Sequence, residues 1–240
     1  TDAAQRQFAK GLQAKGISVV WGAACRRRRF GSRVSPGGVA PLLRGGLKAR
    51  AVPFTTEARR RYAEASRLLH VAVSVGREVL HVIIVYGYSN AERDREQRTL
   101  NEGLLKEALA ILVELGNAPT ILCGDLNTSI QGSLVLSSNA EAGVIHDFAS
   151  LQAVATASQV QPTCFQQGSS RGTVIDHVMG NSVACHAFDG FQHVKSSIPT
   201  HKPLSCRLQL AMCRQEGVRY RRPAPIALDW GLKDKQAEEA

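Results

Sequence analysis

The stretch of sequence that decides the fold is Cys123-Gly-Asp-Leu-Asn127, which ends the short apolar run Pro119-Thr-Ile-Leu-Cys-Gly124. A short, wholly apolar run of this kind is typical of a strand that is buried on both faces inside a layered α/β structure. Such folds place their reactive side chains in the loops at strand ends, which is where Asp125 and Asn127 stand. The stretch therefore predicts an α/β fold with a functional loop after this strand.

The segments before this strand have the periodicities of the same fold class. Residues 67–75 and 79–85 are β-type runs, and Gly76-Arg-Glu78 between them predicts a hairpin. Apolar residues at helical spacing predict a surface helix over 91–115, closed by Gly116-Asn117. We therefore expect a hairpin, a covering helix and the buried strand in this order.

Shorter elements are expected toward both ends of the chain. They are a helix over 3–15 that ends at Gly16, a strand at 17–21, an apolar run at 38–44, and strands at 174–179 and 204–210. Pro41 removes one ladder hydrogen bond, so its run fits an edge strand or a bulge. The composition changes near the end, which predicts a domain over 1–211 and a tail or linker over 212–240.

The charge balance limits the class of partner. The 240 residues include 30 Lys and Arg against 20 Asp and Glu, a formal net charge of +10. A basic balance favours a polyanionic partner such as nucleic acid. Hydrophobic residues make up 44% of the chain, which is ordinary for a packed globular protein and argues against disorder.

Other global features bear on the compartment. The sequence has no run of about 18 apolar residues, and Thr1–Arg6 lacks the pattern of a signal peptide. We expect a soluble protein without a membrane partner. The six cysteines are scattered, with no pair at the two-residue spacing of a zinc site, which favours a reduced, intracellular chain. They are Cys25, Cys123, Cys164, Cys185, Cys206 and Cys213.

Four polar segments interrupt or end the apolar runs. They are Val85-Tyr-Gly-Tyr-Ser-Asn90, Gly124-Asp-Leu-Asn127, Ile175-Asp-His177 and Pro199-Thr-His201. Together they offer two carboxylates, an amide, an imidazole and a phenol, the groups that hydrolysis of a phosphodiester requires. Each segment alone has a plainer interpretation, because Asp and Asn often cap turns and a single His is often a surface residue.

Taken in order, four sets of residues resemble the endonuclease/exonuclease/phosphatase family, which includes abasic-site endonucleases and the endonuclease domains of LINE-type retrotransposons. They are Tyr86, Gly124-Asp125-Leu126-Asn127, Ile175-Asp176-His177 and Thr200-His201-Lys202-Pro203. Thr163 and Phe165 are similar to the strand that precedes the Asp176 segment. The resemblance covers roughly residues 8–211 and implies a four-layer α/β/β/α sandwich of two mixed sheets with flanking helices.

The resemblance also implies a role for each site residue. Asp125 matches the aspartate that orients or activates the attacking water, and Asn127 the amide that holds a phosphate oxygen. His201 matches the histidine that stabilises the developing charge, with Asp176 as its carboxylate partner. Tyr86 fits the tyrosine that approaches the phosphate, although Tyr88 and Asn90 in the same segment remain rivals.

The chain also departs from the family pattern. The family's first strand carries an Asn and its second a metal-binding Glu in a Leu-Gln-Glu element, so we expect the first two strands to be missing here. Thr200 replaces the aspartate of the family's closing Ser-Asp-His. The resemblance implies Mg²⁺, or Mn²⁺, as the cofactor, but Mg²⁺ usually binds through one or two carboxylates, so its site is expected to be weakened. The metal ligands stay unassigned.

These features favour a metal-dependent phosphodiesterase, specifically an endonuclease of the retroelement or abasic-site type that acts on DNA. Two alternatives stay open: an inactive nucleic-acid-binding remnant of the same fold, and a phosphatase acting on inositol or phospholipid phosphates. A basic run could hold phosphates together with Asn90, act as a nuclear address, or be a solvated surface. It consists of Arg26, Arg27, Arg28 and Arg29. The sequence does not give the oligomeric state.

Overall fold

The computed structural model describes residues 2–22, 39–165, 171–194 and 200–213. Its helices are α1 (Asp2–Gln13), α2 (Glu57–Glu64), α3 (Arg95–Glu114), α4 (Leu134–Glu141), α5 (Phe148–Ala155), α6 (Ser182–His186) and the 3-10 helix η1 (Leu210–Cys213). Its strands are β1 (Ile17–Val19), β2 (Leu42–Arg44), β3 (Lys48–Ala51), β4 (Leu68–Val75), β5 (Glu78–Tyr86), β6 (Thr120–Asp125), β7 (His146–Asp147), β8 (Cys164–Phe165), β9 (Gly172–Thr173), β10 (Asp176–Gly180), β11 (Phe188–His193) and β12 (Leu204–Leu208).

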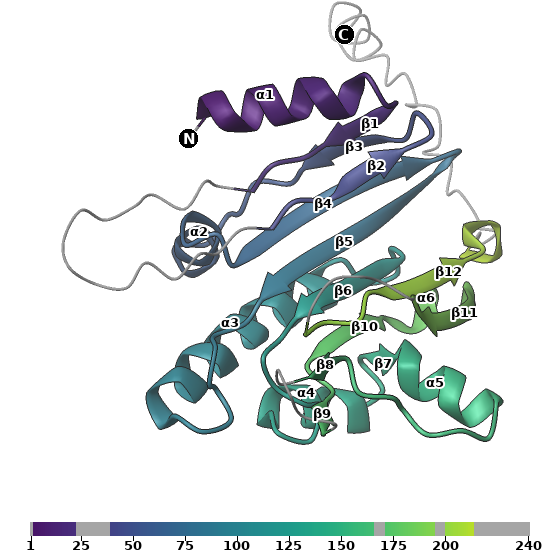
Figure 1. Cartoon of the computed structure of the whole chain (residues 1–240). Coiled ribbons are helices and arrows are strands. Elements are labelled where there is room, and N and C mark those ends of the chain that lie inside the picture. The colour runs from purple at the N-terminus through teal and green to yellow at the C-terminus, as the bar shows by residue number, and fades with distance from the viewer. Residues whose placement is uncertain (1, 23–38, 166–170, 195–199, 214–240) are drawn as a thin grey trace, which may run out of the picture.

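A six-stranded mixed sheet forms the centre of the molecule, in the order β3-β4-β5-β6-β10-β7 (Figure 1). The predicted hairpin is β4–β5, and it turns at Gly76, whose φ of +62° favours glycine. β5 and β6 run parallel, with α3 as the crossover between them, whereas β10 runs antiparallel to β6. The ends of β5 and β6 that carry polar residues therefore lie at the same edge of the sheet.

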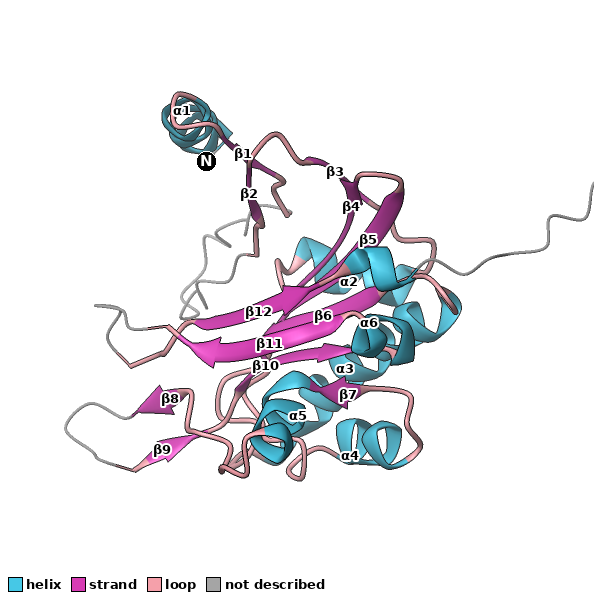
Figure 2. Cartoon of the chain, turned by 90° about the vertical axis from the view of Figure 1, so that its right-hand side faces the viewer, coloured by secondary structure: helices cyan, strands magenta, loops and turns pink. Residues whose placement is uncertain are grey.

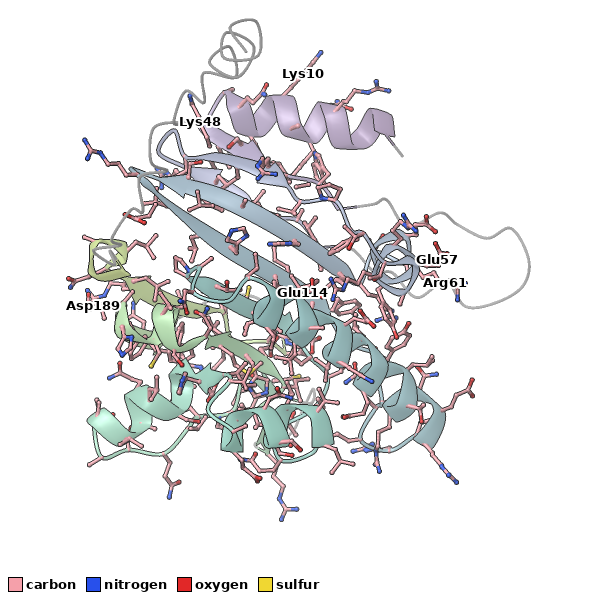
Figure 3. The ribbon with its side chains drawn as sticks, turned by 180° about the vertical axis from the view of Figure 1, so that it is seen from behind. Lys10, Lys48, Glu57, Arg61, Glu114 and Asp189 are labelled. Atoms are coloured by element: carbon pink, nitrogen blue, oxygen red, sulfur yellow. The ribbon has the colours of Figure 1, made fainter. Side chains whose placement is uncertain are left out.

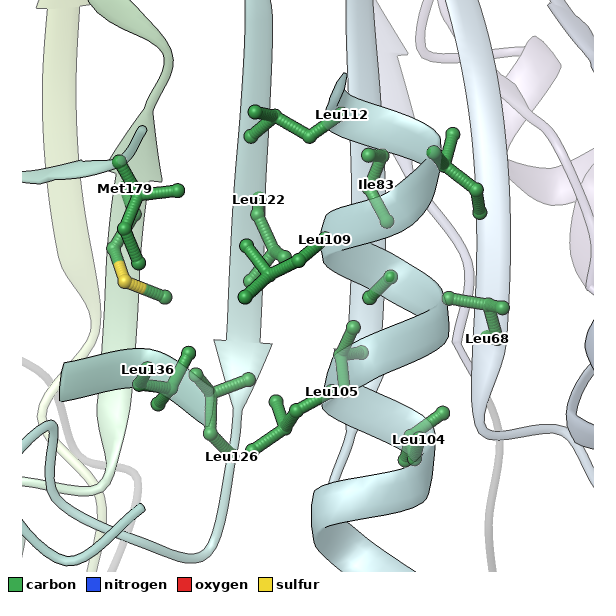
Figure 4. Packing of buried hydrophobic residues seen from close by; sticks show 14 residues of the cluster. Leu68, Ile83, Leu104, Leu105, Leu109, Leu112, Leu122, Leu126, Leu136 and Met179 are labelled. Carbon is green, nitrogen blue, oxygen red and sulfur yellow. The ribbon is translucent and has the colours of Figure 1, made fainter. Parts of the chain in front are cut away.

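Helices α2, α3 and α4 lie on the side of this sheet where the largest hydrophobic cluster is found. Alternate residues of the strands, including Leu68, Ile83 and Leu122, meet the apolar stripe of α3 (Figure 4). Leu104 and Leu105 of α3 are fully buried in this cluster. Each fully buried Leu or Ile side chain contributes about 1.5–3 kcal/mol relative to an exposed one, so this cluster dominates the stability of the fold.

The opposite face of the sheet meets short strand pairs. The β1–β2 pair covers β4, where Leu43 packs with Leu69, Val71 and Val73. The β11–β12 pair lies over β6 and β10, as Figure 2 shows, and joins a third cluster around Phe148. Of the outer helices, α1 packs beside β1, and α5 contacts β10 and β11.

Ion pairs of one buried arginine join α2 to α3. Arg59 of α2 is buried, and its guanidinium bonds Glu107 at 3.0 Å and Glu114 at 2.7 and 2.5 Å, both on α3. Glu57 and Arg61 pair with each other on the exposed side of α2 (Figure 3). The ion pairs of Arg59 explain how so basic a helix packs against the domain, because a buried charge is tolerated only when it is paired.

The predicted fold class is confirmed, with refinements. Only one large mixed sheet forms among the described residues, and the second layer consists of two-stranded pieces. The predicted start of the long helix at Ala91 is wrong, because the Asp94 side chain accepts the N–H groups of Glu96 and Gln97 and caps the helix at Arg95. None of the described helices is both long and apolar enough to span a bilayer.

Candidate active site

Strand register brings three of the predicted site residues into one row. Tyr86 at the end of β5 pairs with Asp125 at the end of β6, and Asp125 pairs with Asp176 at the start of β10. Partners in neighbouring strands point to the same face of a sheet. His177, the next residue, points to the other face, where its Nε2 lies 3.2 Å from the carbonyl oxygen of Thr128. The ladder alone therefore sets the two carboxylates side by side.

Glycine is required directly before Asp125 for steric reasons. Gly124 has a φ of +141°, a backbone conformation that residues with a side chain rarely adopt, and a Cβ at this position would clash with the carbonyl oxygen of Val85. The N–H of Gly87 then donates to the Asp125 carbonyl oxygen at 2.7 Å. β5 and β6 thus approach each other closely at the position where the site begins.

The turn after β6 fixes the Asp125 carboxylate. Asn127 adopts a left-handed conformation, with φ of +51°, and its backbone N–H donates to Asp125 Oδ1 at 3.0 Å. The Asn127 side chain donates through Nδ2 to the carbonyl oxygen of Gly87 at 3.3 Å. Turn capping, the plainer interpretation of these two residues, is therefore present in the structure. It also holds the carboxylate and the amide at the polar edge of the sheet.

Thr163 holds the start of β10 in place. Its Oγ1 accepts the backbone N–H groups of Ile175 at 3.1 Å and Asp176 at 3.0 Å, and the residue is only 1% exposed. A hydroxyl oxygen with two lone pairs can accept both bonds. Thr163 therefore fixes the backbone that carries the second carboxylate.

The Asp176 carboxylate in turn orients His201. Nδ1 of His201 lies 2.9 Å from Asp176 Oδ2 and 3.1 Å from Oδ1. Because an ionised carboxylate only accepts hydrogen bonds, Nδ1 carries the proton of the neutral ring and Nε2 keeps its lone pair. The side chain of His201 is 36% exposed and that of Asp176 is 18% exposed, so the imidazole faces solvent while its partner is more protected.

Asp125, Asp176 and His201 form a group that could hold a cation. One ligand atom from each residue lies within 4.8 Å of the other two. Burial, together with the nearby Asp176 carboxylate, raises the pKa of Asp125, whereas the N–H of Asn127 and the ring of His201 oppose this change. Two adjacent carboxylates that repel each other are a suitable place for a divalent cation, which would neutralise both.

The two tyrosines of the β5 loop have different surroundings. Tyr86 lies in the row with Asp125, while Tyr88 packs against the main hydrophobic cluster. Asn90 has a φ of +64°, and its carbonyl oxygen accepts the N–H groups of Arg93 and Asp94 at 2.9 Å in the turn before α3.

Four predicted substrate contacts and most of the predicted tail lie outside the part of the chain that the structure describes. Arg26 to Arg29, predicted to hold phosphates, lie outside the described residues. Residues 214–240, most of the predicted tail, also lie outside them. The boundary near residue 212 and the role of the arginines therefore stay predictions.

Two buried polar residues that the sequence analysis did not identify support the site loops. Asn101 of α3 accepts the N–H of Tyr88 and donates to the carbonyl oxygen of Leu126, both at 2.9 Å. Arg67 donates to the carbonyl oxygens of Tyr86 at 3.1 Å and Gly87 at 2.6 Å. A detectable signal existed for Asn101, because it is a polar residue on the apolar stripe of a helix.

Comparison with solved structures identifies the fold. A 3'-5' exonuclease (NExo) from Neisseria meningitidis matches with a TM-score of 0.59 and 16% identity, over 83% of this chain and 82% of that one. An AP endonuclease from Archaeoglobus fulgidus matches with a TM-score of 0.61 and 14% identity, over 83% and 82%. The endonuclease domain of TRAS1, a telomere-specific non-LTR retrotransposon, matches with a TM-score of 0.54 and 12% identity, over 81% and 79%.

These likenesses establish that the chain has the endonuclease/exonuclease/phosphatase fold, a fold of nucleases and phosphoesterases. No family model and no curated protein matches the sequence. At such low identities the comparison speaks for the fold alone. The activity must be argued from the side chains of the site.

Proposed function

We propose that this chain is a divalent-cation-dependent phosphodiesterase that hydrolyses DNA, an endonuclease of the retroelement or abasic-site type. The observation that carries the proposal is the convergence of Asp125, Asp176 and His201 from three separate segments of the chain. The AP endonuclease and the TRAS1 endonuclease domain share the fold. The net charge of +10 adds the expected attraction to a polyanion.

Each residue has a role that its contacts support. Asp125 orients the attacking water, because its carboxylate is held by the N–H of Asn127. His201 stabilises the charge that develops on the phosphate oxygens, a role for which Nε2 must carry a proton as well as Nδ1, and Asp176 fixes the orientation of its ring. The resemblance gives Asn127 and Tyr86 the role of contacting the phosphate and holding it in line for attack.

The donor set fits a divalent cation such as Mg²⁺ or Mn²⁺, which prefers oxygen ligands and usually takes one or two carboxylates. Asp125 and Asp176 would hold it. A cation bound there would neutralise phosphate charge and stabilise the leaving oxygen.

A plasmid-nicking experiment tests the proposal. Supercoiled plasmid is incubated with the full chain while Mg²⁺ is titrated, and the nicked product is quantified. We expect Asp125→Ala and His201→Ala each to lower the rate by about 100-fold or more. The matched control is His186→Ala, which removes an exposed imidazole on α6. Nicking that survives both site substitutions would refute the assignment.

One feature favours a second candidate, a nucleic-acid-binding protein that does not cut. Thr200 stands where the resemblance implies an aspartate, so the site has one carboxylate fewer for the cation. Binding to a labelled duplex that weakens with salt, together with no nicking at any Mg²⁺ or Mn²⁺ concentration, would favour this candidate.

A further inference from the structure

A thiol lies beside the imidazole of the proposed site. Sγ of Cys164 is 3.6 Å from Nε2 of His201, on the side of the ring away from Asp176. The sequence predicted no zinc site, because no two cysteines have the two-residue spacing of such a site, and Cys164 and His201 are 37 residues apart. The structure nevertheless brings a soft sulfur ligand next to the imidazole that lies with two carboxylates.

The backbone fixes this proximity. Cys164 and His201 form an antiparallel bridge. The flanking hydrogen bonds run from Phe165 N to the Thr200 carbonyl oxygen and from Lys202 N to the Thr163 carbonyl oxygen, both at 2.7 Å. This pattern makes Cys164 and His201 a non-hydrogen-bonded pair, the type in which facing Cα atoms are about 4.5 Å apart and the side chains are closer. The thiol is therefore held at the ring independently of its own side-chain contacts.

The geometry points to a zinc site. We infer that Zn²⁺ binds between Cys164 Sγ and His201 Nε2, with water completing its shell, and that it inhibits the phosphodiesterase reaction. Typical bonds of about 2.3 Å to sulfur and 2.0–2.1 Å to nitrogen place the two ligand atoms of a tetrahedral site roughly 3.5 Å apart. The distance between Sγ and Nε2 is 3.6 Å.

The Asp176–His201 pair has the form that zinc-binding histidines usually show. Nδ1 of His201 donates to a carboxylate, so the lone pair of Nε2 is directed to the metal, as in carboxylate–histidine–zinc triads. Thiolate and imidazole favour Zn²⁺, whereas Mg²⁺ prefers carboxylates and water. Cys164 therefore changes the preference of the site toward the softer ion. On binding, the thiol releases its proton to solvent and the thiolate takes its place in the metal shell.

Cys164, His201 and Asp176 could instead form a thiol nucleophile with a His–Asp pair. Nucleophilic cysteines, however, lie in surroundings that favour the thiolate. Here burial and the carboxylates of Asp176 and Asp125 raise the pKa of Cys164. A metal cation removes this disadvantage because it coordinates the thiolate directly.

Co²⁺ is the probe for the test, because it occupies zinc sites and a bond to thiolate gives it a charge-transfer absorption band in the near ultraviolet. The full chain is stripped of metal and titrated with Co²⁺, as wild type, Cys164→Ser and Cys185→Ser. In the wild type we expect the absorbance of the band to saturate at one equivalent of Co²⁺. The same result is expected for Cys185→Ser, which changes a cysteine on α6, and no band is expected for Cys164→Ser. Absence of the band in the wild type, or its survival in Cys164→Ser, would overturn the inference.

Affinity and inhibition are then measured with Zn²⁺. Competition with a chromophoric chelator should show Zn²⁺ affinity falling by more than about 100-fold in Cys164→Ser, beyond the loss of about 10- to 100-fold typical of an outer-shell partner. His201→Gln is the second variant, and it should weaken Zn²⁺ binding while circular dichroism shows the chain folded. Unchanged affinity in folded forms of both variants would contradict the proposed ligands.

Inhibition by Zn²⁺ rests on the proposed phosphodiesterase function, whereas Zn²⁺ binding itself does not depend on it. With Mg²⁺ present, Zn²⁺ should suppress nicking by the wild type at concentrations at least about 100-fold lower than those needed for Cys164→Ser, each relative to its own rate without Zn²⁺. Equal inhibition of both would refute the inhibitory role of this site. If no variant nicks DNA while the cobalt band behaves as expected, the proposed function fails and the zinc site stands.

Discussion

Replacing Thr163 by Val would test whether one hydroxyl holds the start of β10. The substitution keeps the shape of the side chain and removes Oγ1, which accepts the N–H groups of Ile175 and Asp176. A buried donor that loses its partner costs about 1–3 kcal/mol. Because two donors lose their acceptor and Val cannot replace it, we expect the free energy of unfolding to fall by about 2–4 kcal/mol.

The matched control is Thr163→Ser, which keeps the hydroxyl and loses only a methyl group, at about 1 kcal/mol. Urea unfolding followed by circular dichroism measures both variants. With a slope of about 2–3 kcal/mol per molar urea, the midpoint of Thr163→Val should lie roughly 0.3–1.5 M below that of Thr163→Ser. If the two variants unfold within a few tenths of a kcal/mol of each other, the assigned role of the hydroxyl is wrong.

Two further predictions concern buried charge. Burial and the nearby His81 and Arg50 lower the pKa of His70 to about 4, whereas a His in the unfolded chain has a pKa near 6.5. Between these two values the unfolded chain binds more protons than the folded one. The free energy of unfolding should therefore fall as the pH is lowered from 6.5 toward 4, by about 2 kcal/mol by pH 5. His70→Gln should flatten this decline in urea titrations, and an equal decline in both proteins would contradict the cause. Arg59→Met leaves Glu107 and Glu114 of α3 without their partner, and because solvent reaches both carboxylates we expect stability to fall by only about 1–2 kcal/mol. Arg60→Met on the exposed side of α2 is the control and should change the melting temperature little.

Strong local patterns predicted much of the central sheet. The β4–β5 hairpin and β6 follow from alternation, an apolar run and a glycine turn, and these signals do not depend on the rest of the fold. α2 was missed because its sequence, Glu-Ala-Arg-Arg-Arg-Tyr-Ala-Glu, shows no apolar stripe. Its packing depends on ion pairs with a helix far away in sequence, and periodicity contains no such information.

The site shows the same division. The sequence order of Asp125, Asp176 and His201 was enough to predict that they act together, and the structure places them within reach of one another. Cys164 and Asn101 were not singled out. The first gains its importance from an antiparallel bridge and the second from two loops that meet over α3, so both depend on contacts that form only in the folded chain.

The pairing of β6 with β10 has a consequence for how the protein can vary over time. Asp125 and Asp176 face each other only because β6 and β10 pair in this register. A shift of one residue would place His177 opposite Asp125 and point Asp176 to the other face of the sheet. A substitution within the site leaves this register unchanged. An insertion or deletion of one residue inside either strand shifts it. We therefore expect homologous sequences to differ in length within the loops between these strands, while the strands themselves accumulate exchanges without gaps.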